Sequence, residues 1–415
     1  MRKLVVISVD SLFTSDLDKI KDLPGFSEAL SDSIIVKNIE CIYPTLTYPC
    51  HATIMTGCYP NKHGIFHNEK LDPGIHNGNW FWHYKDLKVK TIFDYAKENN
   101  LTTAAVSWPV TGEGPIDYLL PEIWPLKYER SNSAILNAAS LEGKKIYYRN
   151  KHLLDWKENL ALDTFAEAAV MDIVDHHQPD VLFLHQATLD HERHINGTQG
   201  EAILKAHQKH GHWLANIFEM YKRAGIFDKT TFVILGDHGQ LNIRRVVSIN
   251  EMLRRAGLIK TDGLGNVIDY DAYVQSAGIS GHVYIKNKLI AAKVIGILEE
   301  AKHLGYIEQI FNSDQLNSMH LSGDFDYVVE SCPFISISND VDGEIVNEIN
   351  NDDYKYAKAT HGHLPTKGDR PPFIIYNSQL PARIIEQGRL VDEFPTFMKL
   401  LGLVIPDNID GTALI

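Results

Sequence analysis

The stretch best suited to do chemistry is residues 43–57, which read YPTLTYPCHATIMTG. It opens as an extended segment with prolines and then turns apolar, and Pro49 suits a first helical turn because its missing N–H has no partner there. Thr47 is therefore expected at a helix N-terminus, where free backbone N–H groups and the helix dipole favour an anion such as a phosphoryl group. Its hydroxyl is placed as a nucleophile would be, although an isolated Thr-x-Pro more simply caps a helix.

Acidic and imidazole side chains recur after predicted strands elsewhere in the chain. In an open α/β sheet, ligands bind at the edge where the parallel strands end. A spacing of four residues, as in the pair at 190 and 194, lets one helical turn point both side chains at the same spot. The residues that share this kind of placement are Asp10, Asp190, His194, Asp237, His238 and His361.

Three carboxylates and three imidazoles without a thiolate fit two mixed nitrogen and oxygen metal sites. That donor set suits two Zn²⁺ ions best, with Mn²⁺ or Fe²⁺ as alternatives. Each residue alone has a structural explanation, and Asp10 in particular could cap a helix. Asn68 follows Thr47 by 21 positions and is either a turn asparagine or a neutral donor for a developing oxyanion.

The elements that must position these residues are those of an α/β protein. Continuous β-branched or apolar runs, typical of parallel strands buried on both faces, predict a central and mostly parallel sheet with helices around it. The predicted strands cover residues 4–9, 33–41, 103–109, 179–185, 230–236 and 372–376, and the predicted helices cover 91–99, 159–176 and 390–402.

The pattern changes between residues 243 and 353, where short alternating segments surround one predicted helix at 291–303. We interpret this region as an inserted α+β cap, so that residues 1–242 and 354–415 form the catalytic core. Residues 113–157 form an irregular segment that suits the rim of a pocket. We expect the cap and this rim to select the leaving group.

Net charge, cysteine pattern and the length of apolar runs exclude several classes of protein. The 415 residues carry a net charge of −13, which argues against binding a nucleic-acid polymer. The four cysteines form no C-x-x-C pair, so neither a disulfide framework nor a cysteine zinc site is indicated. The N-terminal apolar run, about five residues long, is too short for a signal peptide, and no run of about 18 apolar residues could span a membrane. The expected location is the cytoplasm; the sequence is silent on oligomeric state.

Six ordered motifs carry a family resemblance. They are SVD at 8–10, YPTLTYP at 43–49, HGIxxN at 63–68, DxxxH at 190–194, GDHG at 236–239 and THG at 360–362. Together they resemble the alkaline phosphatase superfamily and, within it, the type I phosphodiesterase/nucleotide pyrophosphatase family. The resemblance implies an alkaline-phosphatase-like fold. Cys50 and His363 stand where the family usually shows other residues.

The resemblance also assigns roles. It implies one metal held by Asp190, His194 and His361, and a second metal held by Asp10, Asp237, His238 and Thr47. Thr47 would be the nucleophile and Asn68 the oxyanion donor. Tyr48 stands where the family usually has phenylalanine and would pack against a substrate base or leaving group.

The implied reaction is hydrolysis of a phosphodiester or pyrophosphate bond through a phosphothreonine intermediate. Metal coordination would lower the pKa of the threonine hydroxyl enough for attack on phosphorus. The partner would be a small phosphorylated, nucleotide-like substrate. Other readings are a phosphonoacetate-type phosphonate hydrolase, a phosphomutase of the same superfamily, and a metal-binding protein without catalysis.

Overall fold

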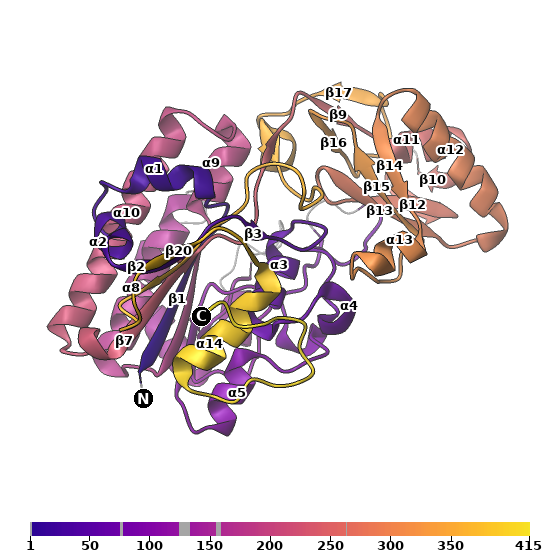
Figure 1. Cartoon of the computed structure of the whole chain (residues 1–415). Coiled ribbons are helices and arrows are strands. Elements are labelled where there is room, and N and C mark those ends of the chain that lie inside the picture. Colours follow the sequence, from indigo (N-terminus) through magenta and orange to yellow (C-terminus); the bar gives the residue numbers. More distant parts are fainter. Residues whose placement is uncertain (1, 75–77, 124–132, 155–158, 263) are drawn as a thin grey trace.

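The computed structural model describes residues 2–74, 78–123, 133–154, 159–262 and 264–415. Figure 1 shows two lobes, a larger one that contains both chain ends and a smaller one coloured mostly orange. Among the described residues, none of the helices combines the length and the apolar character that crossing a bilayer would require.

The larger lobe is built on one eight-stranded sheet with the order β20-β2-β19-β7-β1-β6-β4-β5. Strand β19 is antiparallel to both of its neighbours, and the other pairs are parallel. The predicted mostly parallel sheet is thus confirmed. Its strands are β1 (Lys3–Val9), β2 (Ser33–Val36), β4 (Thr103–Val106), β5 (Tyr118–Leu120), β6 (Val181–Gln186), β7 (Thr230–Leu235), β19 (Phe373–Tyr376) and β20 (Arg383–Ile385).

Helices cover both faces of this sheet (Figure 1). One face is covered by α2 (Phe26–Ser31), α8 (Asn159–His176) and α10 (Glu201–Arg223), and the other by α3 (Thr47–Thr56), α5 (Ile92–Glu98) and α14 (Glu393–Leu401). Central strands β1, β6 and β7 are buried almost throughout, because side chains on both of their faces meet a helical layer. This is why they read as unbroken apolar runs in the sequence.

The smaller lobe holds a four-stranded antiparallel sheet with the order β12-β13-β15-β14. These strands are β12 (Ala272–Ser276), β13 (Ser280–Ile285), β14 (Ile307–Phe311) and β15 (Tyr327–Ser331), and helices α11 (Ile249–Arg255) and α12 (Ala291–His303) pack with them. The lobe has a hydrophobic core of its own, which includes Val274, Val283 and Leu298.

The chain passes between the two lobes through a short antiparallel pair, β8 (Leu241–Asn242) with β18 (Ala359–Thr360). The outgoing and returning segments therefore lie side by side. We infer from this pairing that residues 243–353 are an insertion into the core; the boundaries themselves stay a prediction.

Three parts of the described chain differ from the sequence-based expectation. The segment 133–150, expected to be irregular, forms α6 (Ser133–Ala138) and α7 (Leu141–Asn150). The predicted strand at 33–41 is split into β2 and β3 (Ile39–Glu40), and Asn38 between them has φ +50°. The long helix α10 was not predicted at all. Residues 124–132 and 155–157 of the predicted rim lie outside the described residues.

Helix α9 (Thr188–Asn196), which follows β6, is held by a buried arginine. Arg193 has no exposed surface, and its guanidinium carbon lies 3.6 Å from the centre of the Phe13 ring. The same guanidinium pairs with the buried Asp16 carboxylate and donates to the Thr198 carbonyl. Because Asp190 and His194 lie on this helix, Arg193 fixes the element that carries both of them.

Arg193→Leu is expected to lower the free energy of unfolding by about 3–5 kcal/mol, because it leaves the Asp16 carboxylate buried without its closest cation. Urea unfolding followed by tryptophan fluorescence measures this. Lys205→Ala is the control, since Lys205 forms an exposed pair with Glu201 and its loss should leave the midpoint unchanged.

Acidification gives a second test of the same pair. Burial opposes ionisation of Asp16, but His207 and Arg193 outweigh it and hold the pKa of Asp16 below its ordinary value. A depressed pKa stabilises the folded state above the unfolded value, and this contribution is lost as the pH falls through the folded value. The stability difference between wild type and R193L should therefore shrink below about pH 4. A difference that grows on acidification contradicts this assignment.

Candidate metal centre and adjoining cavity

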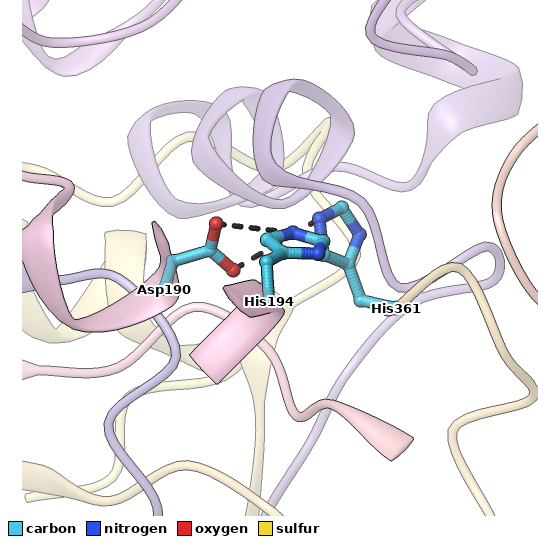
Figure 2. Close-up of side chains that lie close together, drawn as sticks. All are labelled: Asp190, His194 and His361. Carbon is cyan, nitrogen blue, oxygen red and sulfur yellow. Dashed lines mark ion pairs between the residues drawn. The ribbon is translucent and has the colours of Figure 1, made fainter. Parts of the chain in front are cut away.

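The first cluster contains Asp190, His194 and His361, whose ligand atoms lie within 4.8 Å of one another. Figure 2 shows the Asp190 carboxylate facing both imidazoles. His194 Nε2 lies 3.3 Å and His361 Nε2 4.0 Å from an oxygen of Asp190. His194 Nδ1 is 2.7 Å from the Ala359 carbonyl oxygen, so it carries the hydrogen and leaves Nε2 as the nitrogen that can bind a metal.

The second cluster contains Asp10, Asp237 and His238, again within 4.8 Å of one another. All three are almost fully buried. His238 Nε2 lies 3.4 Å from Asp10 Oδ1 and 3.2 Å from Asp237 Oδ2. Thr47 Oγ1 is 3.1 Å from the same nitrogen, so the threonine joins this cluster.

The donor atoms fit a pair of divalent cations. Asp10 Oδ1 and Asp237 Oδ2 are buried oxygens without a hydrogen-bond partner, and such atoms are costly unless a cation or a donor meets them. Burial, Asp237 and Asp190 together raise the pKa of Asp10 well above its ordinary value, because the three carboxylates lie close together. The set of nitrogen and oxygen donors without sulfur suits Zn²⁺, Mn²⁺ or Fe²⁺.

Ser11 connects the two clusters, and the sequence analysis did not predict it as a residue of the site. Its N–H donates to Asp237 Oδ1 over 3.0 Å, and its hydroxyl donates to Asp190 Oδ1 over 3.0 Å. Its φ of +58° lies in the left-handed region, which a non-glycine residue adopts only when the surroundings hold it there. Ser11 thereby holds carboxylates of both clusters in a fixed relation.

Thr47 is the first residue of α3, as expected from the sequence. The Tyr48 N–H beside it donates to Asn68 Oδ1 over 2.9 Å. This N–H is therefore in use, and the Asn68 side chain is held at the start of the helix by its amide oxygen. Thr47 and Asn68 both line the cavity over the metal centre. Their catalytic roles stay predictions.

Tyr48 does not line this cavity. Its side chain is fully buried, its ring packs edge-on against Trp80 at 5.1 Å, and its hydroxyl donates to Glu122 Oε1 over 3.2 Å. The cavity measures about 420 Å³. Its aromatic walls come from Trp80, Trp82 and Tyr356, which the sequence reasoning did not single out. The predicted contact of Tyr48 with substrate stays untested.

The cavity is lined by both lobes. Ser276 and Asn339 reach it from the smaller lobe, and Lys355, from the segment that returns from that lobe, pairs with Glu69 of the larger lobe. Among the described lining residues, Lys355 is the sole lysine or arginine, and its charge is already matched by Glu69. The cavity thus offers aromatic surface and little uncompensated positive side-chain charge.

Comparison with known proteins agrees with this geometry. The family model described as "Type I phosphodiesterase / nucleotide pyrophosphatase" matches residues 4–364. Ectonucleotide pyrophosphatase/phosphodiesterase family member 1 of rat is 24% identical over 246 residues, which cover 57% of this chain and 24% of the relative. Human family member 5 is 23% identical over 264 residues, which cover 61% of this chain and 48% of the relative. The chain thus spans between about a quarter and a half of these curated relatives.

Solved structures show the same fold. The structure of murine ectonucleotide pyrophosphatase/phosphodiesterase 5 aligns with a TM-score of 0.69 at 16% identity, covering 99% of this chain and 98% of that one. Human ectonucleotide pyrophosphatase/phosphodiesterase 5 aligns with a TM-score of 0.68. The expected alkaline-phosphatase-like architecture is thereby confirmed. Since the family model extends over most of its length, the chain belongs to the type I phosphodiesterase/nucleotide pyrophosphatase family.

Proposed function

We propose that the protein is a metal-dependent phosphodiesterase/nucleotide pyrophosphatase that hydrolyses phosphodiester or pyrophosphate bonds through a phosphothreonine intermediate. The observation that carries this proposal is the position of Thr47. Its hydroxyl contacts His238, one of the candidate ligands, at the N-terminus of a helix and on the wall of a cavity. A helix N-terminus favours the negative charge of a phosphoryl group.

Asp190, His194 and His361 would hold one cation, and Asp10, Asp237, His238 and Thr47 would hold the other. When bound, the two ions supply positive charge that lowers the pKa of the threonine hydroxyl and neutralises the phosphoryl oxygens. Zn²⁺ is the metal we propose, with Mn²⁺ or Fe²⁺ as alternatives.

The residues of the chain then act in two stages. Thr47 Oγ1 releases its proton to solvent and forms a bond to phosphorus while the leaving oxygen departs with its bonding electrons. Asn68 Nδ2 donates to a non-bridging oxygen, where charge develops. Water next attacks phosphorus, the bond to Thr47 Oγ1 breaks, and a proton from the attacking water restores the hydroxyl.

The proposed substrate is small, phosphorylated and nucleotide-like. An inactive variant of a murine relative, ectonucleotide pyrophosphatase/phosphodiesterase 5, has been solved in complex with AMP. In this chain Trp80, Trp82 and Tyr356 offer flat surfaces on which a base could stack. The paired charge of Lys355 favours a diester, which carries one negative charge, over a monoester.

We propose that the protein is cytoplasmic and that its partner is a small molecule. The four cysteines are free, and Cys41, Cys50 and Cys58 are buried, which fits a reducing compartment.

Thr47→Ala is expected to lower the turnover of a nitrophenyl nucleotide diester by on the order of 10³-fold or more, because the attacking oxygen is gone. Binding of two zinc equivalents should be mostly retained, since the six other ligands remain. Thr56→Ser is the control, because it keeps the hydroxyl that bonds to the Ala52 carbonyl at the far end of the same helix. If T47A turns over the diester as fast as wild type, Thr47 is not the nucleophile. If the wild-type protein releases phosphate from phosphonoacetate faster than it hydrolyses the nucleotide diester, the protein is a phosphonate hydrolase instead.

The pH dependence of metal binding follows from His361. Burial, with His238 second, lowers the pKa of His361 well below its ordinary value. A lowered pKa keeps the imidazole neutral, and so able to bind a cation, at pH values below the ordinary histidine pKa of about 6.5. Zinc content and initial rates should therefore persist through that value and fall together at lower pH. Loss of zinc already above about pH 6.5 contradicts a neutral, buried His361 as ligand.

A further inference from the structure

Asp10 has a buried partner that the proposed chemistry does not use. His185 lies in β6 opposite Ser8 of β1, two residues before Asp10. Its Nε2 is 3.1 Å from Asp10 Oδ2. Its Nδ1 is 2.6 Å from Glu122 Oε2 and 3.2 Å from the Ser107 carbonyl oxygen. The imidazole therefore bridges two carboxylates that are 112 positions apart in the chain.

Each ring nitrogen of His185 lies within hydrogen-bond distance of a carboxylate group, so the ring joins Asp10 to Glu122. The bond to Nε2 occupies Asp10 Oδ2. It leaves Oδ1, the oxygen without a hydrogen-bond partner, facing His238 in the second cluster.

Glu122 also reaches the start of α3. Its Oε1 accepts from the Tyr48 hydroxyl over 3.2 Å, and Tyr48 follows Thr47 directly and bonds to Asn68 through its N–H. His51 of the same helix packs edge-on against His185 at 4.5 Å, and its Nδ1 lies 2.8 Å from the Thr47 carbonyl oxygen. One buried chain of contacts thus links a candidate metal ligand to the helix turn that carries the nucleophile.

We propose that Glu122 and His185 are positioning residues that fix the orientation of Asp10 toward the second metal and, through Tyr48, the helix turn that carries Thr47. This inference rests on the proposed two-metal function. Hydrogen bonds to the outer oxygen of a metal-binding carboxylate orient it, and removing such a partner typically costs about 10- to 100-fold in metal affinity or activity.

Glu122→Ala is the principal test, because this side chain lies at the cavity wall and is not one of the proposed metal ligands. Zinc is titrated into the metal-free full-length protein in competition with a chromophoric chelator. We expect one of the two zinc equivalents to bind about 10- to 100-fold more weakly and the other to be unchanged. The kcat for a nucleotide diester should fall by a similar factor while KM stays the same.

Three further variants distinguish a specific effect on the orientation of Asp10 from a general disturbance of the fold. Glu122→Gln keeps an oxygen acceptor for His185 and should restore most of the zinc affinity and kcat. His185→Leu should weaken the same zinc equivalent as E122A. His282→Gln is the control, because His282 is equally buried but packs against Phe66 and Phe325, outside the network. It should match wild type in zinc binding.

The outcomes also separate this inference from the proposed function. Unchanged zinc affinity and kcat in E122A overturn the inference, as does equal weakening of both zinc equivalents, which would report general damage. If E122A and E122Q are equally impaired, the hydrogen bond is not the cause and the inference fails. If wild type itself binds fewer than two zinc equivalents, the proposed two-metal function fails first.

Discussion

The dominant constraint in this structure is the crowding of three carboxylates at one edge of a sheet. Asp10 and Asp237 are buried, Asp190 lies partly exposed at the wall of the cavity, and like charges this close together repel strongly. This repulsion acts on Asp10, whose pKa is raised by burial and by the other two carboxylates. At Asp190 the loss of solvation also opposes ionisation, but His194 and His361 outweigh it and hold the pKa of Asp190 well below its ordinary value. Such repulsion between carboxylates is expected at a functional site, where bound cations would offset it.

That constraint also explains which parts of the site the sequence predicts. Unbroken apolar runs identify β1, β6 and β7, and because parallel strands end at a common edge, the polar residues after them must converge. Asp10, Asp237 and the pair on α9 follow from this rule. His361 was grouped with them, but it follows the short strand β18, which pairs with β8 outside the central sheet, so the rule does not explain its place.

The rest of the site could not be predicted because it depends on contacts between distant segments. His185 lies within a buried strand and reads as a core residue, and Glu122 lies in a loop after β5. Their contact spans 63 positions and leaves no periodic signal. Ser11 depends on a left-handed backbone that its neighbours do not indicate. Trp80 and Tyr356 become cavity walls through the docking of the smaller lobe.

The two lobes contribute different residues to the site. Every candidate ligand comes from the larger lobe or from the returning segment at β18, so metal binding depends on the sheet edge. The smaller lobe contributes Ser276 and Asn339 to the cavity but none of the candidate ligands. The paired crossing strands β8 and β18 hold it over that edge, and the Lys355–Glu69 pair joins the returning segment to the loop after Asn68. The lobe has its own hydrophobic core, but its turn beside the cavity also holds the segment that carries His361. The Ile279 N–H donates to the His361 carbonyl over 2.9 Å, and the Ser280 hydroxyl donates to the Gly362 carbonyl over 2.5 Å. The smaller lobe therefore bounds the cavity and helps to place one of the candidate ligands.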